Sequence, residues 1–315
     1  METWNKLDGR FSSAAGELAA RHQTDLLLYS PYAWEAFTRS YRHQPKRVLF
    51  QYHPHIGTER RILDADAARH PGYGESFAQH EEYQLPEHLA RRERDAWKHA
   101  DLIFCASSFT RDSLLAAGCD ASRCRVVPYG IDVLPPGELQ PPPQTFQALF
   151  VGSGGQRKGL HHLLMAWRNA KLPAGSRLTL VCRVLDQGIK TLLEGLKNVT
   201  LIQGLGAREL QELYAKSTLF VMPSLVEGFG QVYLEALAHG CPVLGTANTC
   251  LPDIGTEREG VFLTPSADVD ALVSRLEALG QNLPGNAEIR RAARALAAAY
   301  PWQGFRKMIR HHLAG

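Results

Sequence analysis

Short apolar runs alternate with amphipathic stretches along this chain, a pattern typical of proteins that combine parallel strands with helices. In the first half, polar or glycine-containing turns bound four predicted strands, at 25–29, 47–52, 101–107 and 124–130. Predicted helices in the same half cover 11–22, 87–100 and 108–118. Ser108 is the expected N-cap of the last of these helices, and Gly118 its expected end.

A proline-rich stretch separates this half from a second series of the same kind. Residues 134–144 contain five prolines, which cannot lie within a helix or a central strand, so 134–145 is predicted to be a stiff linker. Predicted strands follow at 146–152, 177–184, 198–204, 218–224 and 241–247. Predicted helices cover 157–170, 186–195, 207–217, the stretch after Gln231, and 300–313.

This alternation predicts two α/β domains, each with a parallel sheet covered by helices, which face each other across a cleft. Ligands of such sheets bind beyond the carboxyl ends of the strands. The expected domains are 1–133 and 146–299, and the last helix, 300–315, is expected to pack back on the first domain.

Composition restricts the class of protein. The 315 residues are 44% hydrophobic and 21% charged, with a net charge of +3, which gives no reason to expect a nucleic-acid partner. No apolar run approaches the length of a membrane-spanning helix, and the N-terminus lacks the apolar core of a signal peptide. Six scattered cysteines, none in a CxxC pair, favour free buried thiols in a reducing cytoplasm over disulfides.

The segment from Pro223 to Val243 carries the clearest chemical signal. A strand ends at Pro223-Ser224, the loop Glu227-Gly228-Phe229-Gly230 follows, and a helix is expected to begin near Gln231. The free N–H groups and the dipole of a helix N-terminus favour phosphate, and glycines let a ligand approach the backbone. Glu227 and Glu235 flank this site, and carboxylates beside a phosphate are suited to hydroxyl donors such as sugars.

A second strand-end loop points to the same ligand. Residues 150–160 form a strand, a glycine-rich turn with Arg157 and Lys158, and the start of a helix. Two cations beside backbone N–H groups can cradle a diphosphate. His161 and His162 follow within the helix and are expected at the surface or in ordinary packing.

These motifs, in this order, resemble the donor-binding domain of the GT4 family of retaining glycosyltransferases, which have the GT-B fold. The similarity runs from about Phe146 to Val273 and includes VG…RKG, LIQG, ELQELYAKS, PSLVEGFG and EALAHGCPV. In the first half, the run from Ser107 to Asp132 also resembles the family's approach to the second domain. The resemblance implies a GT-B-like fold of two Rossmann-like domains, the first of them shortened.

The resemblance also implies roles for individual residues. Glu227 would hold hydroxyls of the donor sugar, Glu235 the ribose hydroxyls, and Lys158 would neutralise the departing diphosphate. The backbone at Phe229, Gly230, Gln231 and Val232, with Gly228, would meet the sugar and the distal phosphate.

Two positions carry further expectations from the resemblance. Ser153 stands where the family often has a second cation, and Arg157 is expected to compensate. His53 matches a histidine that faces the sugar, with His55 as the second choice. The alternatives for these two histidines are a metal pair, for which no residue at the spacing of a third ligand is present, and a structural role.

The implied reaction is transfer of a hexosyl group, with retention, from a nucleoside diphosphate sugar to a hydroxyl of a glycan or lipid-linked acceptor. No obligatory cofactor or metal is expected, since no DxD-like acid cluster lies near the phosphate loop. The alternatives are a non-catalytic or partner-dependent subunit that binds nucleotide sugar, and a sugar phosphorylase, for which no pyridoxal-lysine context is present.

Three expectations concern surfaces. By resemblance about 80 residues are missing before residue 25, so the first sheet is expected to have about four strands, with an edge covered by a second copy, a partner chain or an N-terminal extension. Tyr32, Trp34 and Phe37 are candidates for stacking on an acceptor sugar or for core packing. Two readings remain for the basic residues near the C-terminus, a solvated helix face or a peripheral membrane contact: Arg290, Arg291, Arg294, Arg306, Lys307 and Arg310.

Overall fold

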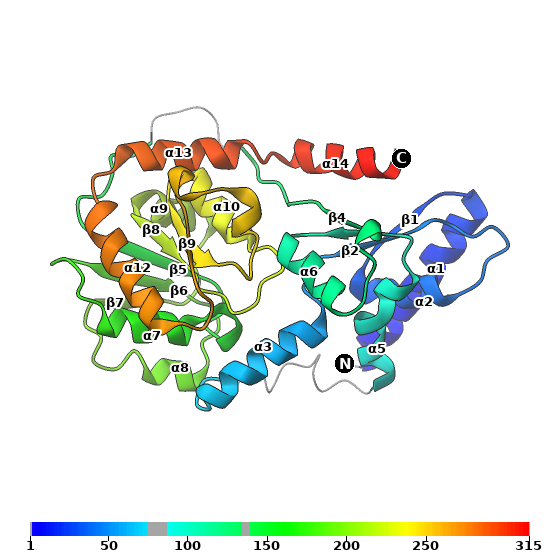
Figure 1. Ribbon diagram of the computed structural model, residues 1–315, viewed down its shortest axis with the longest axis horizontal. Coiled ribbons are helices and arrows are strands. Elements are labelled where there is room, and N and C mark those ends of the chain that lie inside the picture. Colours follow the sequence, from blue (N-terminus) through cyan, green and yellow to red (C-terminus); the bar gives the residue numbers. More distant parts are fainter. Residues whose placement is uncertain (1, 75–86, 134–138, 315) are drawn as a thin grey trace. The chain divides into compact units, whose positions relative to one another are not determined.

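The structure is a computed structural model that describes residues 2–74, 87–133 and 139–314 (Figure 1). The chain divides into two compact units, 1–61 with 79–127 and 62–78 with 128–315. Each unit contains one parallel β-sheet, as the alternating pattern predicts. Of the expected linker, 134–138 lie outside the described residues, and 139–145 contain neither helix nor strand. The expected packing of the last helix on the first domain stays a prediction.

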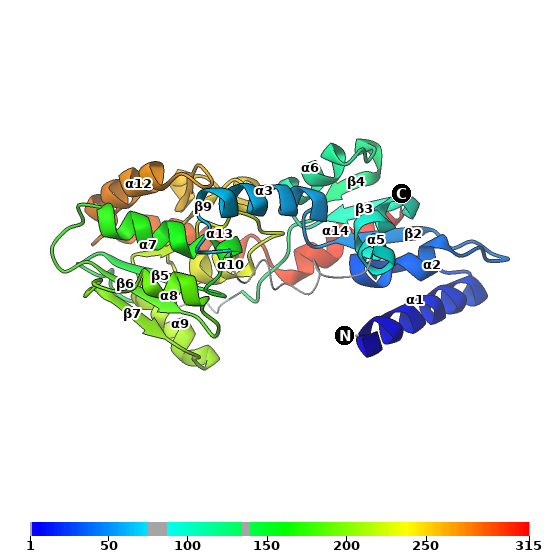
Figure 2. The same cartoon turned by 90° about the horizontal axis from the view of Figure 1, so that it is seen from below.

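The first unit is built on a four-stranded sheet in the order β1-β2-β3-β4. Its strands are β1 (Leu26–Tyr29), β2 (Arg47–Gln51), β3 (Leu102–Cys105) and β4 (Cys124–Val126). Its helices are α1 (Glu2–His22), α2 (Trp34–Thr38), the start of α3 (Ile56–Arg69), α5 (Glu87–Asp95) and α6 (Ser108–Ala116), with 3₁₀ turns η1 (Ser30–Tyr32), η3 (Ala96–His99) and η4 (Ala121–Arg123). Helix α1 packs against α2, as both views show (Figures 1 and 2).

Burial differs between the strands of this sheet. The interior strand β3 is buried at all four positions, as expected where helices cover both faces. The edge strand β1 instead alternates, with Leu27 43% and Tyr29 47% exposed. Phe37 is 1% exposed within the core of the unit, so core packing is the correct interpretation for that residue.

The second unit is built on a six-stranded parallel sheet in the order β10-β9-β8-β5-β6-β7. Its strands are β5 (Gln147–Val151), β6 (Arg177–Val181), β7 (Val199–Ile202), β8 (Leu219–Val221), β9 (Val243–Thr246) and β10 (Val261–Thr264). Its helices are η5 (Gln156–Lys158), α7 (Leu160–Asn169), α8 (Gln187–Thr191), α9 (Ala207–Lys216), α10 (Gln231–Ala238), α11 (Leu251–Ile254), η6 (Glu257–Glu259), α12 (Val269–Asn282), α13 (Ala287–Ala298) and α14 (Trp302–Ala314).

Helices cover both faces of this sheet. Figure 2 shows α7 and α12 together on one side and α9 on the other. Helix α10 packs on α9 and α13. The strand order reverses between β8 and β5, and the loops after these two strands carry the two glycine-containing motifs. A ligand site is expected at such a switch point of a parallel sheet.

Several predicted details need correction. The N-cap of α6 is Ser107, whose hydroxyl accepts from the Thr110 N–H, and not Ser108. Arg290 does not lie on a solvated face: it is 3% exposed and donates to the carbonyls of Ser217 and Ala215, at 2.8 and 2.6 Å. The six cysteines are free and buried, as predicted. Within the described residues, no helix has the length and apolar character needed to cross a bilayer.

Candidate functional site

The turn after β5 is held in a tight conformation by Gly159. This glycine has φ of +68°, in the left-handed region, and a Cβ there would lie 2.0 Å from the Pro223 carbonyl oxygen. The Leu225 N–H donates to the Arg157 carbonyl at 2.9 Å, so the turn also bonds to the loop that follows β8. The two motifs singled out in the sequence therefore form one structure at the carboxyl ends of neighbouring strands.

Glu227 lies at the centre of this structure. Glu227 is 7% exposed. Its carboxylate pairs with the Lys158 ammonium and, at 3.6 Å, with the Arg157 guanidinium. The Glu227 N–H donates to the Asn248 carbonyl at 3.0 Å, which fixes the loop from the other side. A buried carboxylate between two cations keeps a defined position, because its desolvation is compensated only in that geometry.

Helix α10 begins at Gln231, as the sequence predicts, immediately after this loop. Its N-cap, Gly230, has φ of +87°, and a Cβ there would lie 2.6 Å from the Tyr233 ring. The first N–H groups of a helix, here around Gln231 and Val232, have no partner inside the helix. With Arg157 and Lys158 alongside, this end of α10 can bind an anion such as a phosphate.

Glu235 lies one turn further along α10 and, with Gln231, lines a cavity of about 320 Å³. The Tyr214 hydroxyl donates to the Glu235 carboxylate at 3.1 Å, and the Tyr214 ring stacks on His239 at 5.6 Å between centroids. Burial, together with the neighbouring Glu235 carboxylate, raises the pKa of Tyr214, so the phenol stays protonated and can donate. The cavity is lined by Ile131, Asp132, Ala207, Leu210, Gln211, Tyr214, Gln231, Glu235, Ala238, His239 and Trp302.

The remaining predicted residues of the second unit have distinct environments. Ser153 is exposed. Phe229 is 3% exposed and its ring contacts Tyr129 edge-on at 5.1 Å, so its side chain packs in the interior and only its backbone is offered to a ligand. The carbonyl of Phe229 accepts from the Cys250 N–H at 3.2 Å.

The two histidine candidates of the first unit differ in their contacts. His55 is held on both sides: its Nδ1 accepts from the Gly57 N–H at 3.2 Å, and its Nε2 lies 3.2 Å from the Arg94 carbonyl. Burial lowers the pKa of His55, which favours this neutral, structural role. His53 is 28% exposed in its side chain, with Nδ1 3.9 Å from the Glu59 carboxylate. In the described chain, neither histidine belongs to a three-residue group with metal-ligand geometry.

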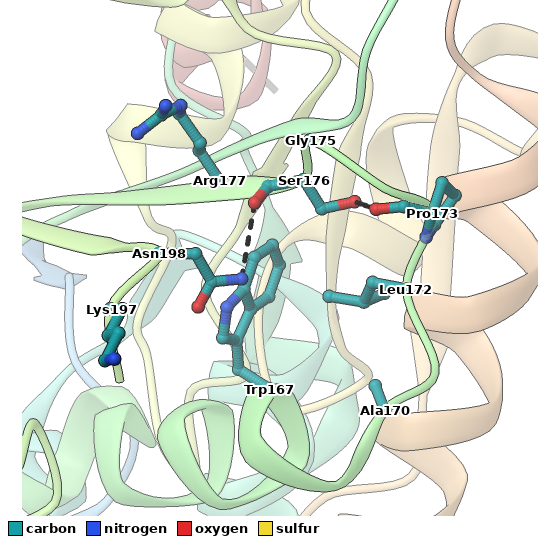
Figure 3. Close-up of a pocket in the computed structure, with 9 residues that line it drawn as sticks. All are labelled: Trp167, Ala170, Leu172, Pro173, Gly175, Ser176, Arg177, Lys197 and Asn198. Atoms are coloured by element: carbon teal, nitrogen blue, oxygen red, sulfur yellow. Dashed lines mark hydrogen bonds between the residues drawn. The ribbon is translucent and has the colours of Figure 1, made fainter. Parts of the chain in front are cut away.

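A second cavity, of about 400 Å³, lies at the opposite ends of the strands (Figure 3). Arg177 at the start of β6 and Asn198 just before β7 line it, and Asn198 donates to the Ser176 carbonyl at 3.3 Å. Because ligands of parallel sheets bind at the carboxyl ends, this cavity is not the expected donor site.

Sequence reasoning missed two features of the second unit. Tyr214 on α9 and Trp302 on α14 line the Glu235 cavity, and only the tertiary structure reveals this. His161 and His162 are 0% and 2% exposed, so of the two expected placements packing is correct and the surface is not; the contact of both with Asp66 is not predicted. The one signal available was the His-His pair directly after the cationic turn.

Comparisons with known proteins agree with this geometry. The family described as "Glycosyl transferases group 1" matches residues 145–282, and "Glycosyltransferase Family 4" matches 3–133. The MMP alpha-(1->4)-mannosyltransferase of Mycolicibacterium hassiacum is 28% identical over 67% of this chain and 53% of its own length. The putative colanic acid biosynthesis glycosyltransferase WcaL of Escherichia coli is 25% identical over 62% of this chain and 51% of its own.

Solved structures with the same fold are found as well. Sucrose-phosphate synthase from Thermosynechococcus elongatus superposes with a TM-score of 0.73 at 19% identity, over 100% of this chain and 80% of that one. Anabaena HepE in complex with UDP gives a TM-score of 0.70 at 17% identity, over 96% and 81%. The chain spans about half the length of the curated relatives it matches. The two family matches together extend over most of the chain, which has the GT-B-like fold and belongs to glycosyltransferase family 4.

Proposed function

We propose that this chain transfers a hexosyl group from a nucleoside diphosphate sugar to an acceptor hydroxyl on a glycan or lipid-linked molecule, with retention of anomeric configuration. The observation that carries the proposal is the buried Glu227 paired with Lys158 and Arg157 at the N-terminus of α10. Cations and a helix N-terminus suit the diphosphate, and the carboxylate at the same point suits the sugar hydroxyls. The structure of Anabaena HepE, which has a related fold, contains UDP-glucose, and this supports the proposed class of donor.

The two glutamates are assigned different parts of the donor. Glu227 holds hydroxyls of the sugar, and Glu235, one turn further along α10 at its own cavity, holds the ribose hydroxyls. Lys158 and Arg157 neutralise the charge that grows on the diphosphate as the bond to the anomeric carbon breaks. Such stabilisation of developing charge is usually the largest contribution to catalysis. His53 is assigned to the sugar or the acceptor.

The stereochemical proposal is a front-face substitution. The acceptor oxygen bonds to the anomeric carbon on the face from which the diphosphate departs, and the acceptor proton passes to the departing phosphate oxygen. No covalent enzyme intermediate and no metal ion at the diphosphate is needed. Added Mg²⁺ or Mn²⁺ is therefore expected to leave the transfer rate unchanged.

The direct test is a transfer assay with a panel of nucleotide sugars and acceptors, with the anomeric configuration of the product read by NMR. Donor binding without transfer or hydrolysis, across the whole panel, would favour the alternative of a non-catalytic or partner-dependent subunit. An inverted product would contradict retention while leaving the donor site intact.

The exposed edge of the first sheet supports a proposal about partners. Leu27 and Tyr29 on β1 are 43% and 47% exposed, and burying apolar side chains of this size stabilises an interface. We therefore expect a second copy or a partner chain to cover this edge. Light scattering of the purified chain tests this, and a monodisperse monomer with full transferase activity would contradict it. The cytoplasmic location and the peripheral membrane contact stay predictions.

A further inference from the structure

A buried cluster of one carboxylate and two imidazoles joins the end of α3 to the start of α7. Asp66, His161 and His162 are 2%, 0% and 2% exposed. His161 Nε2 lies 3.0 Å from one Asp66 carboxylate oxygen, and His162 Nε2 lies 2.6 Å from the other. All three residues belong to the second unit, and one ligand atom from each lies within 4.8 Å of the others.

The convergence of the two imidazoles is unusual. Neighbouring residues on a helix point about 100° apart, yet these rings approach to 4.0 Å between centroids and face the same carboxylate. Within the described residues, the Nδ1 atoms of both rings are buried without a hydrogen-bond partner. The atoms that converge are the two Nε2 atoms, which meet the two oxygens of the Asp66 carboxylate.

The surroundings hold the carboxylate in place and add another donor. The Gln156 side chain donates to Asp66 at 2.7 Å and to the Leu63 carbonyl at 2.9 Å, so it orients the carboxylate. His70 follows Asp66 by one helical turn, and its ring lies 5.0 and 5.6 Å from those of His162 and His161. Asp66 is the only acid in this group. With neutral imidazoles the cluster has a net charge of −1, and a bound divalent cation would change it to +1.

We propose that Asp66, His161 and His162 bind one divalent transition-metal ion of the zinc class. Imidazole nitrogens with one carboxylate oxygen are ligands that Zn²⁺ prefers, whereas Mg²⁺ and Ca²⁺ take oxygen-only sets. With metal–ligand distances near 2.0 Å and tetrahedral geometry, ligand atoms lie about 3.3 Å apart. The observed contacts of 2.6 and 3.0 Å are shorter than this, so binding would lengthen them by about 0.7 and 0.3 Å.

The role of this ion is structural. Residues 62–74 interrupt the first unit in sequence but pack with the second, where a Cβ at Gly188 would lie 1.9 Å from the Gly72 carbonyl oxygen. The metal would tie this segment to α7 only three residues after Lys158, and so would hold the cationic turn in place. This inference concerns a site separate from the donor diphosphate and does not depend on the proposed transfer reaction.

The test is metal binding by the full chain, purified through a tag that contains no histidine. Elemental analysis is expected to find about one zinc per chain after gel filtration. After stripping with a chelator, Zn²⁺ is expected to bind again with a stoichiometry of one, and Co²⁺ to give the visible absorption of a tetrahedral site. Asp66→Asn and His162→Gln should each weaken Zn²⁺ affinity at least about tenfold.

The matched control is the double variant His311→Gln/His312→Gln, which removes the adjacent histidine pair of α14 and should keep the bound zinc. If the Asp66 and His162 variants fail to fold, the Co²⁺ spectrum of the wild-type chain still decides the question. A stripped wild-type chain that shows neither saturable Zn²⁺ binding nor a tetrahedral Co²⁺ spectrum would overturn the proposal. Zinc binding that is lost in the α14 variant instead would overturn it too.

Discussion

The two glutamates of the donor-site segment, eight residues apart, stand in opposite environments. Glu227 is 7% exposed and paired with two cations, whereas Glu235 is half-buried and accepts a hydrogen bond from the uncharged Tyr214 hydroxyl at the wall of a cavity. The carboxylate of Glu227 is fixed in position by two ion pairs. The carboxylate of Glu235 has one hydrogen bond from a hydroxyl and can turn toward a ligand. The difference supports the proposed division, in which the loop before α10 binds the reacting end of the donor and the helix binds its nucleoside.

The largest effect is expected from removing the Lys158 ammonium, which pairs with Glu227 in this loop. Lys158→Met should lower kcat/KM by about 10²–10³-fold, because it removes a charge that stabilises the departing diphosphate. Steady-state transfer kinetics measure this. Lys216→Met on α9, whose side chain is 60% exposed, is the matched control and should leave transfer unchanged. Equal kinetics for the two variants would remove Lys158 from the site.

Glu227→Gln changes the other member of the ion pair with Lys158 and tests whether the carboxylate binds the donor sugar. Transfer should fall by about 10–100-fold, since a charged hydrogen bond to a sugar hydroxyl is worth about 1.5–3 kcal/mol. Affinity for free nucleoside diphosphate, measured by calorimetry, should stay within about threefold of wild type. A loss of nucleotide affinity as large as that of a Glu235 variant would show that the two carboxylates do not divide the donor as proposed.

Glu235→Ala is the complementary change. Because the variant loses a contact to the ribose hydroxyls, the affinity for free nucleoside diphosphate should fall by about 1.5–3 kcal/mol. Calorimetry with the same nucleotide measures this, and Glu212→Ala on the exposed face of α9, 50% exposed, is the control. Unchanged affinity would place the nucleoside elsewhere.

Gly159→Ala tests the backbone that places Lys158 beside Glu227. An alanine at φ of +68° with its Cβ 2.0 Å from the Pro223 carbonyl should lower the free energy of unfolding by about 2 kcal/mol. Gly195→Ala, at φ of +80° with no atom within 4 Å of the added Cβ, isolates the cost of the left-handed conformation, about 1 kcal/mol. Urea unfolding compares the two, and equal losses would show that the contact with Pro223 relaxes freely.

The sequence predicts five of the six strands of the second unit, because each of these is a short apolar run, and it predicts the turns that contain glycine. The strand β10 (Val261–Thr264) is not predicted. The start of α10 at Gln231 is predicted because Gly230 marks it locally. Packing between distant segments leaves no such local signal. Asp66 and His161 are 95 residues apart along the chain, and their contact depends on residues 62–74 joining the second unit. Arg290 likewise looks like a surface cation until Ser217 is placed beside it.

The smallest effect is expected from Tyr214→Phe, which tests whether the hydrogen bond from Tyr214 helps Glu235 to bind the nucleotide. The variant keeps the ring that stacks on His239 and removes only the hydroxyl that donates to Glu235 at 3.1 Å. Because the hydroxyl acts on the nucleotide only through Glu235, its loss should weaken nucleotide binding by less than the loss of a direct charged hydrogen bond, by about 2–10-fold. In the double variant with Glu235→Ala, Tyr214→Phe should cost nothing further, because the hydroxyl acts only through the carboxylate. Additive losses in calorimetry would instead mean that the Tyr214 hydroxyl contacts the nucleotide itself.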